Sequence, residues 1–342
     1  MKKITFLILI TASFFLSFEA SAQLFDLEDF NSLTLGNIGT DPDGNTPGQG
    51  GLLTITGSGV NTDFQVIDSG VPELGNILQF IGSDETTDVR YLWKDGLEDF
   101  WNNTRTSGND VLEVDFVFFT GGATTSKNEL RLEIYDAGFT KIIAGLIFYP
   151  ETKIIQGMVY ANGGSGLGTY IVSLGAGATS DAVLLEDSFY PVGVAFDVAT
   201  GTVTFRSVDF YISFPGAAMN NIPFEADLSV YPGAGNTASS VSFIDNFKIR
   251  AVDTEMLLGT TDNELSQSVK VFPNPVNNVV NLSLTSNIIP TKIEIVDVNG
   301  RIVKSINNTI RNQIDVSELS KGLYLLNIYS IEGKATKKFM KN

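Results

Sequence analysis

The strongest pattern in this sequence is an alternation of apolar and polar residues with a period of two. Leu112, Val114, Phe116 and Phe118 occupy one face of an expected strand, and residues 129–134 alternate charged with aliphatic side chains. Because successive side chains of a strand point to opposite faces, these segments are expected to be half-buried strands. Clusters of Gly, Ser, Asn and Asp separate them, and no long amphipathic helical pattern occurs. The sequence therefore predicts an all-β, antiparallel two-sheet sandwich.

Two residue types are missing from the chain, and this removes whole classes of chemistry. Among 342 residues there is no cysteine and no histidine. Disulfides, thiolate nucleophiles, thiolate metal sites and imidazole-based catalysis are therefore excluded. Carboxylates, lysine, tyrosine and oxygen-ligated metals remain available. With 43% hydrophobic and 18% charged residues, the chain is apolar enough to fold, and its length allows two domains.

Charge is distributed unevenly along the chain. Residues 23–262 contain 32 acidic and 10 basic residues, whereas residues 263–342 contain 6 acidic and 10 basic residues. A segment this acidic repels phosphate backbones and anionic lipid surfaces, so we expect no nucleic-acid partner. Neutral glycans or divalent cations fit the acidic segment better.

The N-terminus has the pattern of a secretory signal. Met1–Lys3 is followed by the apolar run Ile4–Phe18 and by the small-residue segment Ala20–Ala22, so that cleavage would leave Gln23 first. A membrane anchor is the alternative, but Glu19 ends the apolar run after about 15 residues, and a span needs roughly 20. We therefore expect residues 1–22 to be a signal peptide and the mature protein to have no membrane span.

The end of the chain carries several motifs in a fixed order. Val271–Val276 reads V-F-P-N-P-V, and its two prolines predict an extended start. Ile293–Val298 alternates and leads into Asn299–Gly300, a strong hairpin signal. Leu319–Ile328 reads L-S-K-G-L-Y-L-L-N-I, and the chain ends in the lysine-rich segment Lys337–Lys341. These features predict a small antiparallel sandwich.

Together, these motifs resemble the type A C-terminal sorting domain of type IX secretion cargo, over residues 269–342. The resemblance implies recognition by the outer-membrane type IX translocon and its sorting machinery, followed by removal of the domain. It also implies that the protein is secreted, or held at the extracellular face of the outer membrane of a Gram-negative bacterium. The alternative is an ordinary adhesive sandwich that happens to come last.

Residues 253–268 lack periodicity and are expected to be a linker, which leaves residues 23–252 as the main domain. Within it, residues 191–205 and 241–249 resemble the late hairpin and last strand of concanavalin A-like and carbohydrate-binding jelly rolls. The resemblance implies a jelly-roll β-sandwich and a sugar ligand, without choosing between binding and cleavage. The full prediction is an antiparallel jelly-roll β-sandwich followed by a small C-terminal β-sandwich sorting domain.

Aromatic residues in polar or glycine-rich segments are the candidate ligand-binding residues, because sugars stack on aromatic rings. Tyr91 and Trp93 share one strand face, and Trp101 lies soon after in a polar segment. Tyr160 and Tyr170 flank a glycine-rich turn. The alternative for both tryptophans is a place in the core, since large aromatic side chains are mostly buried.

One carboxylate is a candidate metal ligand. Asp245 alternates in step with the apolar residues of Val241–Ile249, which points it inward unless a bulge rotates it. A buried carboxylate needs a partner, and a structural Ca²⁺ ion would supply one. Calcium-binding jelly rolls suggest Glu28 as the second ligand. The alternative is that Asp245 accepts backbone N–H bonds. Asp41–Asn45 resembles part of a calcium loop but is expected to be a turn.

Glycosidase activity requires two carboxylic acids at a defined spacing. Laminarinase-like glycosidases carry E-x-D-x-x-E, and Glu113 and Asp115 match its first two positions, but Phe118 occupies the third. Glu129 and Glu133 are expected on a solvated strand face. The leading interpretation is an exported, non-catalytic glycan-binding protein. The alternatives are a structural or adhesive surface protein without a small ligand, and a carboxylate-based glycosidase.

Overall fold

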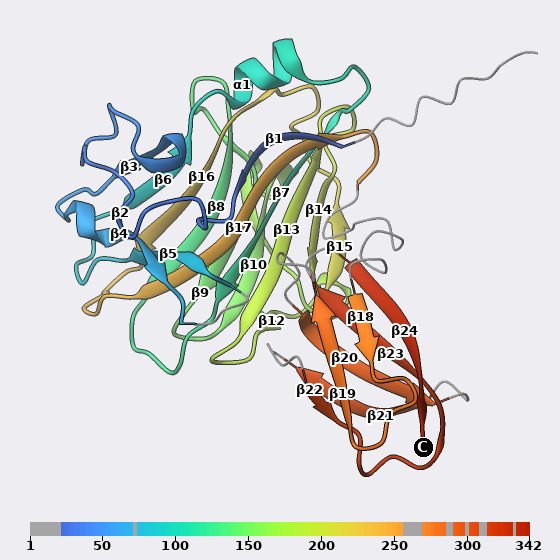
Figure 1. Cartoon of the computed structure of the whole chain (residues 1–342). Coiled ribbons are helices and arrows are strands. Elements are labelled where there is room, and N and C mark those ends of the chain that lie inside the picture. The colour runs from blue at the N-terminus through green and yellow to red at the C-terminus, as the bar shows by residue number, and fades with distance from the viewer. Residues whose placement is uncertain are drawn as a thin grey trace, which may run out of the picture.

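The computed structural model describes residues 22–70, 74–255, 269–284, 290–297, 301–307, 313–330 and 333–342. The expected signal peptide, most of the expected linker and the Asn299–Gly300 turn lie outside the described residues. The chain is built from antiparallel strands with few short helical turns, among them α1 (Leu97–Asp99), which confirms the all-β prediction (Figure 1). No helix in the described ranges is both long and apolar enough to cross a membrane.

Two antiparallel sheets form the main body. The first has the order β15–β14–β13–β7–β17–β5–β4–β2, with β1 also pairing with β17. Its strands are β1 (Gln23–Glu28), β2 (Gly36–Asn37), β4 (Phe64–Asp68), β5 (Asn76–Ile81), β7 (Val111–Phe119), β13 (Phe189–Asp197), β14 (Val203–Ser207), β15 (Tyr211–Phe214) and β17 (Val241–Val252).

The second sheet has the order β11–β10–β9–β8–β16–β6–β3, with β12 pairing with β10. Its strands are β3 (Leu52–Ile55), β6 (Arg90–Lys94), β8 (Asn128–Asp136), β9 (Ile142–Tyr149), β10 (Ile154–Gly163), β11 (Gly166–Ser173), β12 (Ala182–Val183) and β16 (Pro223–Pro232).

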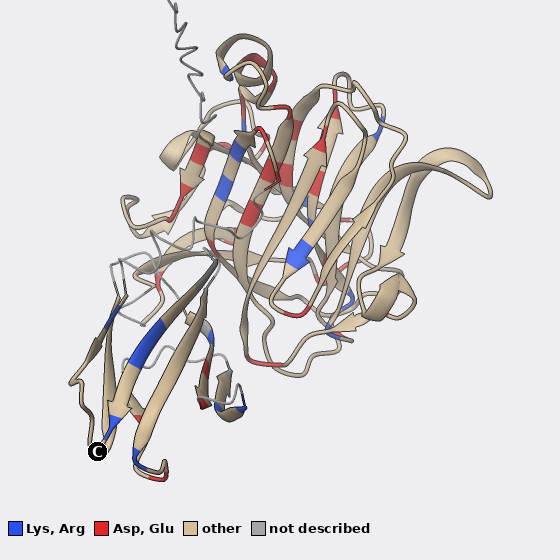
Figure 2. Ribbon diagram, turned by 90° about the vertical axis from the view of Figure 1, so that its right-hand side faces the viewer, with Lys and Arg blue, Asp and Glu red and all other residues tan. Residues whose placement is uncertain are grey.

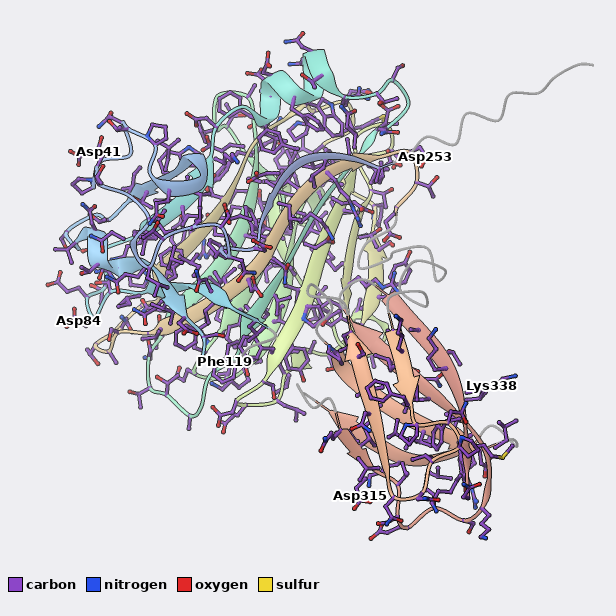
Figure 3. All side chains as sticks on the ribbon, in the orientation of Figure 1. Asp41, Asp84, Phe119, Asp253, Asp315 and Lys338 are labelled. Atoms are coloured by element: carbon purple, nitrogen blue, oxygen red, sulfur yellow. The ribbon has the colours of Figure 1, made fainter. Side chains whose placement is uncertain are left out.

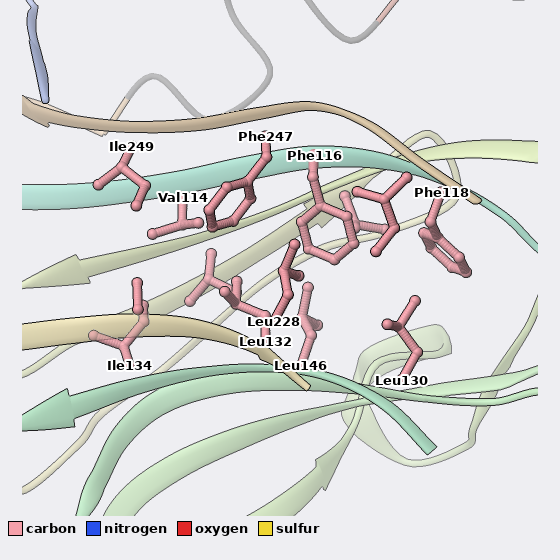
Figure 4. Packing of buried hydrophobic residues seen from close by; sticks show 14 of the residues in the cluster. Val114, Phe116, Phe118, Leu130, Leu132, Ile134, Leu146, Leu228, Phe247 and Ile249 are labelled. Atoms are coloured by element: carbon pink, nitrogen blue, oxygen red, sulfur yellow. The ribbon is translucent and has the colours of Figure 1, made fainter. Parts of the chain in front are cut away.

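The two sheets face each other across one hydrophobic core (Figure 4). The first sheet contributes Val114, Phe116 and Phe247, and the second contributes Leu132 and Leu228, all at most 3% exposed. Alternate positions of each strand point into this core, as the period of two predicts. The residues between them therefore lie on the outer faces of the sandwich, where any open site must be built.

A bulge in β17 changes the predicted direction of one side chain. The pairing of β17 with β7 shifts register between Asp245 and Lys248, and Asn246 adopts a positive φ of 51°. Ile244 and Phe247 both point into the core, so the alternation reverses at the bulge. Asp245 is buried but does not continue the inward row of Phe247 and Ile249, because the bulge inserts one extra residue between them.

The C-terminal residues form two small sheets with their own core. One sheet has the order β18–β19–β22 and the other β21–β20–β23–β24. The strands are β18 (Val269–Phe272), β19 (Val279–Leu284), β20 (Pro290–Asp297), β21 (Ile302–Asn307), β22 (Gln313–Asp315), β23 (Gly322–Ser330) and β24 (Gly333–Lys341). Val280 and Leu282, predicted to share a face, are both buried in this core. The small antiparallel sandwich is confirmed.

Candidate functional site

A cleft of about 550 Å³ opens on the outer face of the second sheet. β3, β6, β8 and β16 and the segments that follow β6 and β8 line it. Five of the lining residues are aromatic, three are carboxylic acids and none is a cation. The lining residues are Ile55, Tyr91, Trp93, Asp95, Tyr135, Phe139, Phe224, Glu225 and Asp227.

The lining side chains point outward because their neighbours fill the core. Leu92 lies between Tyr91 and Trp93 and is fully buried among core residues. Leu228, next to Asp227, is likewise a core residue. Alternation along β6 and β16 therefore turns Tyr91, Trp93 and Asp227 to the opposite face.

Two of the predicted binding residues, Tyr91 and Trp93, lie together in the cleft. The Tyr91 hydroxyl lies 2.6 Å from the hydroxyl of Tyr231, and Trp93 Nε1 donates a hydrogen bond of 2.9 Å to Asp95 Oδ1. Burial raises the pKa of Tyr91. Gly44 adopts a φ of +71° beside the Trp93 ring, and a Cβ there would lie 2.5 Å from a ring carbon. Glycine therefore lets the backbone close against the indole.

Two acids on β16, Glu225 and Asp227, form the polar centre of the cleft. A bulge between Pro223 and Glu225 sets the register, so that Glu225 pairs with Tyr135 and Asp227 with Glu133. The two acids lie two residues apart on one strand face, and the negative charge of Glu225 opposes ionisation of Asp227. Burial raises the pKa of Glu225 to about 7 and that of Asp227 to about 9. The pair therefore shares a proton at neutral pH.

Glu133 lies behind this pair and is fully buried. Its carboxylate accepts hydrogen bonds from Arg131 Nη1 (3.2 Å), Ser229 Oγ (3.0 Å) and the Tyr135 hydroxyl (3.1 Å). The Arg131 guanidinium stacks 3.9 Å from the centre of the Tyr231 ring. The predicted solvated face is thus wrong for Glu133, because side chains from β16, distant in sequence, cover it.

The other three predicted binding residues are not among the lining residues of this cleft. Trp101 is 2% exposed and packs in the core, with the Arg105 guanidinium 4.6 Å from its ring centre. Trp101 is also among the residues that line a separate cavity of about 280 Å³. The centre of the Tyr160 ring, on β10, lies 5.1 Å from Lys141 Nζ. The Tyr170 hydroxyl, on β11, donates a hydrogen bond to the carbonyl oxygen of Gly166. The core position of Trp101 corrects the prediction that it offers a binding face.

The two predicted metal ligands, Glu28 and Asp245, influence each other electrostatically but have other partners. Burial raises the pKa of Asp245 to about 8, and the charges of Asp29 and Glu28 add to the shift. Asp245 accepts hydrogen bonds from Asn246 N (2.7 Å) and Asn246 Nδ2 (3.1 Å), and Glu28 Oε1 accepts one from Phe30 N (2.7 Å). Across the described ranges, no three acidic residues come close enough to hold a metal. The fit to calcium is therefore incomplete, and calcium stays a prediction.

Two further acidic segments have structural partners. Asp41 Oδ1 and Oδ2 accept hydrogen bonds from Asp43 N and Asn45 N, which confirms the expected turn (Figure 3). Glu113 and Asp115 lie on β7, in the first sheet, and form ion pairs with Arg250 and Lys248 on β17. Acidic residues occur on several strands of the main body (Figure 2). Glu113 and Asp115 are thus engaged away from the cleft.

The fold defines an all-β protein in which a jelly-roll-like main sandwich is followed by a second, small sandwich. Residues 270–342 match the family described as the secretion system C-terminal sorting domain. A sorting domain of this kind marks type IX secretion cargo, so the protein is secreted, to the cell surface or the extracellular space, and is handled by that machinery. A search of curated proteins found no match to the chain.

Several solved structures are similar to this chain in overall fold at low identity. The catalytic domain of a glycoside hydrolase family 131 protein from Coprinopsis cinerea is 13% identical, with a TM-score of 0.44, covering 67% of this chain and 94% of that one. A GH131 β-glucanase catalytic domain from Podospora anserina is 12% identical, with a TM-score of 0.39, covering 67% and 96%. The CBM2 module of the evolved Dit protein of Lactobacillus casei BL23 phage J-1 is 12% identical, with a TM-score of 0.40, covering 69% and 98%.

Proposed function

We propose that the exported protein binds a glycan in the cleft of the second sheet and does not cleave it. The observation that carries this proposal is the composition of the cleft: five aromatic rings surround three carboxylic acids in a space of about 550 Å³. Aromatic faces complement the C–H-rich faces of sugar rings, and carboxyl groups hydrogen-bond their hydroxyls. An open cleft with these groups also favours a ligand over a purely structural or adhesive role.

The spacing of the acids supports binding rather than cleavage. Retaining glycosidases hold two carboxyl groups about 5–5.5 Å apart, and inverting enzymes hold them about 6.5–9.5 Å apart. Glu225 and Asp227 lie two residues apart on the same face of β16 and not on opposite sides of the cleft. Glu133 is fully buried, and its carboxylate is occupied by Arg131.

Hydrolysis is the second candidate, and one observation favours it. Asp227 is a protonated acid at neutral pH beside an open cleft, which is what a general acid requires. If the protein cleaves glycans, reducing ends appear with time and Asp227→Asn abolishes them. We expect no release of reducing ends from any polysaccharide that the protein binds.

A polysaccharide pull-down with the purified protein tests the proposal. We expect retention on at least one neutral or basic polysaccharide, and loss of retention in Trp93→Ala. Tyr170→Ala is the matched control, because Tyr170 is aromatic and partly buried but is not among the lining residues of the cleft. Retention that survives Trp93→Ala and is lost in Tyr170→Ala would place the site on β11 instead.

The proposal includes the processing of both ends. Removal of residues 1–22 and of the sorting domain from residue 269 onward would release the main sandwich. Intact mass measurement of the secreted protein tests both cuts, and a mature N-terminus other than Gln23 contradicts the first.

A further inference from the structure

The cleft is lined by more carboxylic acids than hydrogen bonding to a neutral ligand requires. Asp95, Glu225 and Asp227 line it, and no lining residue is basic. The nearby guanidinium of Arg131 forms ion pairs with Glu129 and Glu133 instead. A ligand in the cleft therefore meets negative charge that the surrounding protein does not balance.

Asp227 is where this imbalance is greatest. Asp227 is only 5% exposed. Its Oδ1 atom receives no hydrogen bond from any donor in the described part of the chain. Its neighbour is another acid, Glu225, and the charges of Glu133 and Asp95 add to the repulsion. A buried carboxylate in these surroundings requires a positive partner, which is a proton when the cleft is empty.

Aromatic rings complete the surroundings of the pair. Tyr91 and Trp93 from β6 and Tyr135 from β8 line the same cleft. The faces of aromatic rings attract cations, and rings combined with carboxylates are the usual means of recognising an ammonium group. The cleft thus presents both kinds of group that bind an organic cation.

We propose that the cleft prefers glycans that carry free amino groups, with the sugar ammonium taking the place of the proton shared by Glu225 and Asp227. This inference rests on the proposed glycan-binding function and narrows its ligand class to amino sugars. Binding then releases a proton to solvent: the carboxylic acid loses its O–H proton, and the two carboxylates hydrogen-bond the ammonium. Uronic acid polymers are disfavoured, because their carboxylates would face Asp95 and the acid pair.

The titratable and charged groups that face the pair determine the pH range of this exchange. They are Asp95 after β6, Glu133, Arg131 and Tyr135 on β8, Tyr91 on β6 and Tyr231 on β16. Burial and the neighbouring acids raise the pKa values of the pair, and a bound ammonium group lowers them because its positive charge favours the ionised carboxylates.

The test compares three β-1,4-linked oligomers of equal length: glucosamine, N-acetylglucosamine and glucose. Calorimetry with the full protein at about pH 7, where the pair is not yet fully protonated, is expected to show glucosamine binding about tenfold more tightly than the other two. Repeating the titration in two buffers of different ionisation enthalpy is expected to show proton release only for glucosamine. Asp227→Asn is expected to remove most of the preference for glucosamine. Glu225→Gln, at a half-buried position, is expected to do the same.

Glu186→Gln is the charge-matched control, because Glu186 is exposed and is not among the lining residues of the cleft. It is expected to keep the preference, which rules out a general effect of net charge. Equal affinity for the three oligomers, or a preference that survives both Glu225→Gln and Asp227→Asn, overturns this inference and leaves glycan binding standing. If none of the three binds and the polysaccharide pull-down also finds no ligand, both proposals fail.

Discussion

Glu225 and Asp227 lie two residues apart on one face of β16 and line the same aromatic cleft, where the charge of Glu225 opposes ionisation of Asp227. Two acids in this relationship cannot both ionise at low cost, so the folded protein retains a proton that the unfolded chain releases. This single relationship links the stability of the fold to its ligand chemistry, and the first prediction follows from it.

Asp227→Asn is expected to make stability less dependent on pH. The folded-state pKa of Asp227 is raised to about 9 from an ordinary value of 3.8, so between these values the folded protein binds more protons than the unfolded chain. The contribution of Asp227 is therefore fully present below about pH 4 and is lost as the pH rises through about 9.

Thermal melts between about pH 6 and 9 check this. We expect the melting temperature of the wild type to fall about 5 °C further than that of Asp227→Asn. Asp245, whose pKa is also raised, remains in both proteins, so the difference between them reports the Glu225–Asp227 pair. Parallel curves for the two proteins would contradict the shared proton.

Trp93→Ala is expected to weaken glycan binding by about tenfold or more without unfolding the protein, because the half-buried ring lines the cleft. Trp93→Phe keeps an aromatic face and is expected to retain part of the affinity. Affinity measured by calorimetry and melting temperature measured in parallel separate the two effects. Unchanged affinity in Trp93→Ala would move the site elsewhere.

Trp101→Ala is expected to have the opposite profile. Trp101 is 2% exposed in the core, so its removal should cost about 3–5 kcal/mol of unfolding free energy. Ligand affinity of the folded fraction should stay close to that of the wild type. Denaturant unfolding measures the first quantity, and a stable Trp101→Ala protein without affinity would restore Trp101 as a binding residue.

Arg250→Met is expected to destabilise the protein by about 3–5 kcal/mol, because it leaves Glu113 charged and fully buried. The double variant Glu113→Gln/Arg250→Met should recover much of this loss, since no uncompensated charge remains. A double-mutant cycle in urea measures the coupling. Additive effects would show that the ion pair does not hold β7 to β17.

The calcium prediction is tested by melting the protein with added Ca²⁺ and with chelator. If Glu28 and Asp245 hold the ion, Ca²⁺ raises the melting temperature of the wild type and not that of Asp245→Asn. An unchanged midpoint in the two conditions would contradict the calcium prediction.

Local pattern was sufficient for the strands and for part of the site. The alternation around Val114 and Leu132 predicts strands whose core faces the structure confirms. Tyr91 and Trp93 were identifiable because two aromatic residues on one outward strand face need no knowledge of the partner strands. The order of motifs near the chain end was enough to identify the sorting domain.

The pairing of Glu225 with Asp227 in the cleft could not be predicted from the sequence pattern. Glu225 and Asp227 are separated by one alanine, a spacing that also occurs at Glu113 and Asp115, where both acids form ion pairs. Only the pairing of β16 with β8 shows that Arg131, on the neighbouring strand, forms its ion pairs with Glu129 and Glu133 and not with the first pair. The bulge at Asp245 is a second example, because its extra residue reverses an alternation that the sequence alone continues.

The position of β16 between β8 and β6 also affects when the protein can act. A chain still emerging from the ribosome, or stopped before Pro223, has β6 and β8 but lacks β16, which pairs with both of them. The cleft is therefore completed only by a late, long-range step of folding, and binding in it requires that step.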